Sequence, residues 1–133
     1  MLAAIPLLIL PFAIYNLAML GLFGGTAGLG AGVMSLSMLS GATWAMSFGD
    51  LLIVVALLLL FVEILKATRT GTRALMDHLL SMVLFIAFLV EFLLVAPAAT
   101  QIFFILMTIS FIDVIAGFSV SMRSAGRDVS IGL

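Results

Sequence analysis

Two long apolar segments, joined by a short basic connector, occupy residues 50–91 and constrain the fold more than any other feature. Residues 51–62 are apolar without interruption, and residues 79–90 are interrupted only by Ser81. Within lipid, only helices or a closed barrel satisfy every backbone hydrogen bond internally. Barrel strands would alternate in polarity over segments of roughly 10 residues. Because these segments are continuously apolar, they predict a transmembrane helical hairpin.

The composition of the whole chain supports the same class. Of its 133 residues, 65% are hydrophobic and 8% are charged, whereas charged residues make up about 25% of a typical soluble protein. So few polar side chains could not cover a soluble fold, and lipid must solvate its outer face. The length corresponds to one domain. The net charge of −1 offers no basic surface for nucleic acid, and the lack of cysteine excludes disulfides and thiolate metal sites.

The fold class predicted is all-α: a polytopic integral membrane protein with four transmembrane helices in a small bundle. The spans are expected at 2–22, 49–65, 75–95 and 101–122, close to the length of about 20 residues that crosses a bilayer. The chain start lacks the positively charged region of a signal peptide, so a retained first helix is expected. Residues 27–48, which include Trp44, are uncharged and only moderately apolar. A fifth, re-entrant or interfacial segment is left open there.

Glycines recur every four positions at Gly24, Gly28 and Gly32. On a helix they would form one stripe that allows close packing against a neighbouring helix. The same glycines could form a flexible loop. A phosphate-binding loop is disfavoured, because no Lys-Ser or Lys-Thr pair follows and no soluble strand precedes.

The basic residues predict the orientation. All five lie either in the 66–73 connector or in a short tail after residue 122: Lys66, Arg69, Arg73, Arg123 and Arg127. Two spans separate these groups, so they lie on the same side, which the positive-inside rule identifies as cytoplasmic. With four spans, both termini are cytoplasmic. The expected location is a bacterial-type inner membrane.

Most acids have structural explanations. Asp50 and Asp77 are expected at helix starts, where the helix dipole stabilises a carboxylate. Glu63 precedes Lys66 by three residues, a spacing at which the two side chains meet. Asp113 differs, because it lies about 18 Å along the helix from residue 101 and about 15 Å from residue 123, near the bilayer midplane. It shares a face with small or weakly polar residues, here called the polar seam: Ser110, Gly117 and Ser121.

Asp113 and the shallower Glu91 are therefore the intramembrane acidic candidates. No Lys or Arg is expected to reach the depth of Asp113, so an ion-pair partner would come from another subunit. Two alternatives stay open. Asp113 could be a static, protonated packing group, or it could exchange its proton as a relay site.

No catalytic or metal-binding cluster is predicted, and the single histidine, His78, is interpreted as an interfacial residue rather than a haem ligand. The protein is not expected to be an enzyme.

The leading hypothesis is a small non-catalytic subunit of a larger inner-membrane complex of transport, respiratory or photosynthetic type. Membrane lipids, other integral subunits or further copies are its expected partners. No cofactor is predicted, although bound lipid, pigment or quinone is left open. The alternative is a small oligomeric ion or proton channel or transporter that uses Asp113 and Glu91. A third possibility is a phage-type pore-former, which the small size of the chain allows but no other feature supports.

Overall fold

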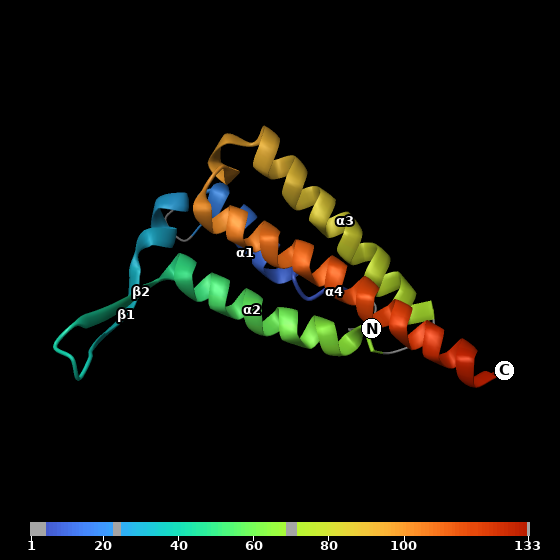
Figure 1. Cartoon of the computed structure of the whole chain (residues 1–133). Helices are drawn as coiled ribbons and strands as arrows, with labels where there is room; N and C mark the ends of the chain where they lie inside the picture. Colours follow the sequence, from blue (N-terminus) through green and yellow to red (C-terminus); the bar gives the residue numbers. More distant parts are fainter. Residues whose placement is uncertain (1–4, 23–24, 69–71, 133) are drawn as a thin grey trace.

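A computed structural model describes residues 5–22, 25–68 and 72–132 of the chain, without the side chains of 26, 72–74 and 121–132. Helices dominate, as predicted (Figure 1). In chain order the elements are α1 (Ile9–Met19), η3 (Thr26–Gly30), β1 (Gly32–Ser37), β2 (Thr43–Ser47), α2 (Phe48–Lys66), α3 (Thr72–Leu94), η4 (Ala96–Ala98) and α4 (Gln101–Gly132).

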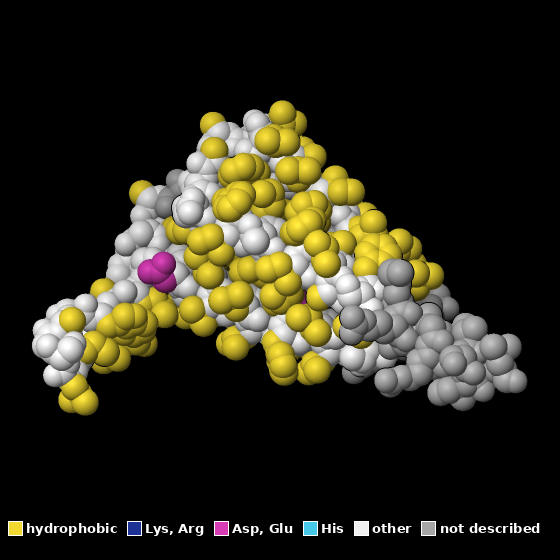
Figure 2. All heavy atoms as spheres, in the orientation of Figure 1, with side chains coloured by type: hydrophobic (Ala, Val, Ile, Leu, Met, Phe, Trp, Pro, Cys, Tyr) yellow, Lys and Arg dark blue, Asp and Glu magenta, His cyan; other side chains and the backbone are white. Residues whose placement is uncertain are grey.

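Three helices are long and apolar enough to cross a membrane. The qualifying segments are Phe48–Lys66, Leu75–Leu94 and Gln101–Val120. Large apolar side chains remain exposed along all three, and the face seen in Figure 2 is covered mainly by apolar side chains. Such a surface requires lipid as its solvent, which supports the membrane class predicted from the composition.

The expected span at 2–22 is not confirmed. Of its residues, 2–4 lie outside the described part, and the helix covers only Ile9–Met19, 11 residues. Its length of about 16 Å is well short of a bilayer. Proline explains where the helix begins: Pro6 precedes it, while Pro11 lies in its first turn, where a missing N–H leaves no hydrogen bond unmade. Because the prediction of two cytoplasmic termini rests on four spans, it stays a prediction.

Residues 27–48 form neither a span nor a helical re-entrant segment. A short 3₁₀ helix is followed by an antiparallel hairpin of β1 and β2, which extends away from the packed helices (Figure 1). Gly41 in its turn has a φ of 91°, a conformation that favours glycine. The alternation of serine with larger apolar residues in 34–38 is the period-two pattern of a strand, a signal that the expectation of a span or a re-entrant segment left out.

The predicted hairpin of spans is more open than expected, because α4 lies between α2 and α3 and packs against both (Figure 1). Gly49 of α2 permits one close approach, since a side chain there would collide with Ile102 of α4. The connector is shorter than predicted, because α2 includes Lys66 and α3 begins at Thr72. The last helix also continues to Gly132, past the predicted end at 122, so no separate tail follows it there.

Aromatic rings fill the core near the start of α4. Phe103 is fully buried, and its ring packs against Tyr15 of α1 and against Phe88 of α3. Phe12 of α1 also meets Phe88 edge to face, with ring centroids 4.7 Å apart. These apolar contacts hold the short α1 against the long helices. They lie near the end of the helix bundle at which α4 begins with Gln101, here called the Gln101 end; the opposite end is called the Lys66 end.

Candidate functional site

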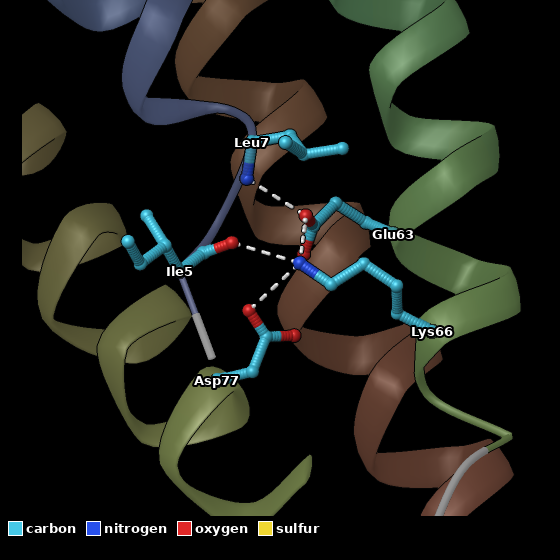
Figure 3. A network of polar contacts seen from close by, with 5 residues as sticks. All are labelled: Ile5, Leu7, Glu63, Lys66 and Asp77. Atoms are coloured by element: carbon cyan, nitrogen blue, oxygen red, sulfur yellow. Dashed lines mark hydrogen bonds and ion pairs between the residues drawn. The ribbon is translucent and has the colours of Figure 1, made fainter. Parts of the chain in front are cut away.

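A cluster of charged side chains is buried between the three long helices, at the opposite end from the aromatic core. Glu63 and Lys66 come from α2, Asp77 from α3 and Asp113 from α4, and they are between 2% and 9% exposed. Buried charges are rare unless they are paired. We call these four residues the polar cluster, and most of it is drawn in Figure 3.

Lys66 is the centre of this cluster rather than a residue of the connector. Its Nζ donates to Glu63 Oε1 at 3.0 Å, to Asp77 Oδ1 at 3.1 Å and to the carbonyl oxygen of Ile5 at 2.8 Å (Figure 3). Three acceptors match the three N–H donors of an ammonium group. The predicted contact between Glu63 and Lys66 is confirmed. The expectation that Asp77 lies at a helix start is wrong, because α3 begins at Thr72 and the Asp77 side chain is buried and paired with α2.

The chain before α1 closes the cluster on another side. The backbone N–H of Leu7 donates to Glu63 Oε1 at 2.7 Å, and the carbonyl of Ile5 accepts from Lys66 (Figure 3). Hydrogen bonds to charged groups are about twice as strong as neutral ones. The polar cluster therefore holds the segment before α1 as well as joining α2 to α3.

Asp113 has neighbours within its own chain, contrary to the prediction that only another subunit could supply a cation. Ser81 of α3 donates a hydrogen bond to its carboxylate, and Lys66, Glu63 and Asp77 are near enough to interact with it electrostatically. Ser81 lies about 9 Å along α3 from Leu75 and about 20 Å from Leu94. Ser81 is thus about 5 Å from the middle of this span, so Asp113 lies close to the middle of the candidate spans, displaced toward the end at which Lys66 lies. The expectation that no cation of this chain comes near Asp113 is wrong, because the buried side chain of Lys66 points inward from α2.

Polar atoms continue along α4 on both sides of Asp113. Among the described residues, Asp113 Oδ2, Ser110 Oγ and His78 Nε2 are buried without a hydrogen-bond partner. His78 of α3 packs beside Gly117, where a Cβ atom would lie 2.9 Å from its ring. Ser110, Asp113 and Gly117 thus share the buried side of α4, as the polar seam predicted; the side chain of Ser121 lies outside the described part.

The other predicted site residues lie apart from this cluster. Glu91 is half-buried on α3, ten residues or about 15 Å from Ser81. Asp50 caps α2 reciprocally with Ser47, which confirms its expected role at a helix start. Gly28 lies in η3 and Gly32 in β1, so these two do not share one helix. Further positions fall outside the described backbone or have undescribed side chains: Gly24, Arg69, Arg73, Arg123 and Arg127.

An apolar groove of about 500 Å³ runs between α1 and α3. Ile5 and Pro6 line one part of it, next to the polar cluster, and Asn16 is its one polar side chain. The short α1 leaves this part of α3 uncovered. A groove of this volume is in the range of small-molecule sites, which are about 300–1,000 Å³. Its lining is Ile5, Pro6, Ile9, Phe12, Ala13, Asn16, Leu80, Val83, Leu84 and Ala87.

Sequence reasoning identified Asp113 but missed its association with Asp77 and Lys66. Their positions in the sequence could have indicated this association. Lys66 and Asp77 lie on either side of the same short connector, so they come from helix ends that must be close together.

Among the described residues, no group of three or more His, Asp and Glu side chains is arranged to hold a metal ion. Comparison of the chain with protein-family models, with curated proteins and with solved structures gives no significant match.

Proposed function

We propose that this protein is a small membrane transporter or channel component that binds and releases a proton at the polar cluster. The observation that carries the proposal is the imbalance of its charges. Among the described side chains, Glu63 and Asp77 contact the ammonium group of Lys66, and Asp113 is near enough to interact with this group electrostatically. Three carboxylates and one ammonium leave two negative charges when all are ionised.

An uncompensated charge away from water costs several kcal/mol, so such a cluster favours taking up a positive charge. A proton fits better than a metal ion, because the described acids do not form a metal-ligand group. Asp113 is the best candidate for the exchanging group. Its Oδ2 is without a hydrogen-bond partner among the described residues, while the N–H donors of Lys66 serve Glu63, Asp77 and Ile5.

The surroundings of Asp113 support access from one end. Toward the Lys66 end, His78 packs beside Gly117, one turn along α4, and offers a polar nitrogen. Beyond Ser110 in the opposite direction, the interior is filled by Leu106 and Phe103. A continuous pore is therefore disfavoured, and proton uptake coupled to a conformational change is favoured. In this proposal the Lys66 end faces the cytoplasm of a bacterial-type cell, as the basic residues predict, and Glu91 takes no part.

Infrared difference spectroscopy of the protein in liposomes tests the proposal without knowledge of a transported partner. A pH jump is expected to change the carbonyl band of a protonated carboxylic acid, and Asp113→Asn is expected to remove that change. Glu91→Gln is the matched control, since it also neutralises a membrane acid but lies outside the cluster. An unchanged band in a folded Asp113→Asn protein would refute the assignment to Asp113.

A second candidate, a non-catalytic subunit of a larger membrane complex, is favoured by the groove between α1 and α3. A helix of another subunit, or the tail of a lipid, pigment or quinone, would cover this apolar surface. Purification in mild detergent followed by mass measurement separates the candidates. Stable co-purification with other integral proteins supports the subunit. A protein found alone or only with further copies, with Asp113-dependent proton exchange, supports the first proposal.

A further inference from the structure

The β-hairpin of β1 and β2 has two chemically different faces. Directly paired residues lie on the same face of a sheet, and the pairs Met34 with Met46 and Leu36 with Trp44 place four large apolar side chains on one face. The other face carries the pairs Ser35 with Ala45 and Ser37 with Thr43. The hairpin is therefore amphipathic across its width.

The apolar face is uncovered by the rest of the protein. Met34, Leu36 and Trp44 are between 40% and 51% exposed, and Leu39 in the turn is fully exposed. A two-stranded hairpin alone is at best marginally stable in water. Residues 32–47 also contain no charged side chain that would keep them in water. These properties require that something apolar covers the face.

The connection to α2 indicates what covers it. Ser47 ends β2 and caps α2, so the hairpin joins directly to the start of a helix that is long and apolar enough to cross a membrane. Figure 1 shows the hairpin extending sideways from this end rather than continuing along the axis of α2. For a helix that crosses a bilayer, a hairpin that leaves its end at an angle lies closer to the bilayer surface than one that continues along the helix axis. Tryptophan also favours the boundary between lipid and water, because its ring is apolar and its N–H is polar.

We infer that residues 32–47 bind the lipid surface, with the face of Met34, Leu36, Trp44 and Met46 toward the acyl chains and the serine face toward water. The hairpin then extends the membrane-embedded surface of α2 beyond the helices. It would limit tilting of α2 and fix the depth of that helix end. This inference does not depend on proton exchange at Asp113.

Trp44 is the single tryptophan of the chain, so its fluorescence reports the hairpin alone. The protein is placed in phosphatidylcholine vesicles that contain lipids brominated either near the headgroup or deep in the acyl chain. The expected result is emission at shorter wavelength than in water, with stronger quenching by the shallow bromines. A variant with Met34→Ser and Leu36→Ser is expected to lose most of this quenching. Ser35→Ala with Ser37→Ala, on the opposite face, is the matched control and is expected to keep it.

Two results would overturn the inference. Water-like emission unaffected by either brominated lipid would mean that the hairpin projects into solvent. Short-wavelength emission without lipid quenching would mean that a second copy or another protein covers it, for example by pairing with the open edge of β1 or β2. Circular dichroism of each variant establishes that the helices remain folded.

Discussion

The segment that contains α1 is attached to the long helices at both of its ends, by different chemistry. At the Lys66 end, the backbone of Ile5 and Leu7 binds the charged groups of Lys66 and Glu63. At the Gln101 end, the hydroxyl of Tyr15 donates to the carbonyl of Pro97 at 3.0 Å and lies 2.6 Å from the hydroxyl oxygen of Thr100, also within hydrogen-bond distance. The first attachment is ionic, and the second is neutral.

The difference predicts how much stability each attachment loses when one of its side chains is removed. In a buried ionic cluster, removal of one charge leaves the others without compensation, and the loss exceeds the worth of one contact. In a neutral contact, removal of one group costs about one hydrogen bond. We therefore expect the charged attachment to respond to changes in ionisation, while the neutral one keeps the opposite end of α1 in place.

Lys66→Met tests this comparison with the largest expected effect. It removes the cation that pairs with Glu63 and Asp77 while keeping an unbranched apolar side chain. Loss of one partner from a buried ion pair destabilises a protein by about 3–5 kcal/mol. Unfolding by denaturing detergent, followed by circular dichroism, measures the change. Adding Glu63→Gln to Lys66→Met is expected to recover part of the stability; an unaltered loss in the double variant would contradict the charge argument.

Gly117→Ala tests the packing of α3 on α4 beside the cluster. The added methyl would lie 2.9 Å from the His78 ring, so the ring or the helix must move. Overpacking of this kind costs about 1–3 kcal/mol. The same unfolding measurement detects it. Ala116→Ser, at the neighbouring position on α4, is the control for a small change in the same turn. Equal stability of Gly117→Ala and the unmodified protein would show that His78 moves away freely.

Tyr15→Phe tests the neutral attachment. It removes only the hydroxyl and keeps the ring that packs on Phe103, so the loss is expected to be about 1–2 kcal/mol, the cost of a buried hydrogen bond. The value is measured as for Lys66→Met. A loss as large as that of Lys66→Met would remove the distinction between the two ends.

Ser47→Ala has the smallest expected effect. Ser47 accepts a hydrogen bond from the Asp50 backbone N–H at the exposed start of α2. Loss of such a cap costs about 0.5–1 kcal/mol. Hydrogen exchange of the first turn of α2 is expected to rise, with no change near Glu63. Faster exchange throughout α2 would mean that the cap controls the whole helix.

Local patterns in the sequence predicted what depends on neighbouring residues. Of the four spans that the apolar segments predicted, three are long helices. The acid at residue 50 predicted a helix start, and the spacing of Glu63 and Lys66 predicted their contact. The face shared by Ser110, Asp113 and Gly117 was also evident from helical periodicity. The strands at 32–47 were not predicted, because their period-two pattern is short and was not used.

The sequence by itself determined that lipid must surround much of this protein, since so few charged groups cannot cover a soluble fold. It also determined the three long helices, because a continuous apolar segment in lipid must satisfy its backbone hydrogen bonds internally. Only the tertiary structure decided that α4 lies between α2 and α3 and that Lys66 points inward. Those two facts bring Glu63 and Asp77 into contact with Lys66 and place Asp113 nearby, a long-range association that no spacing along the chain encodes.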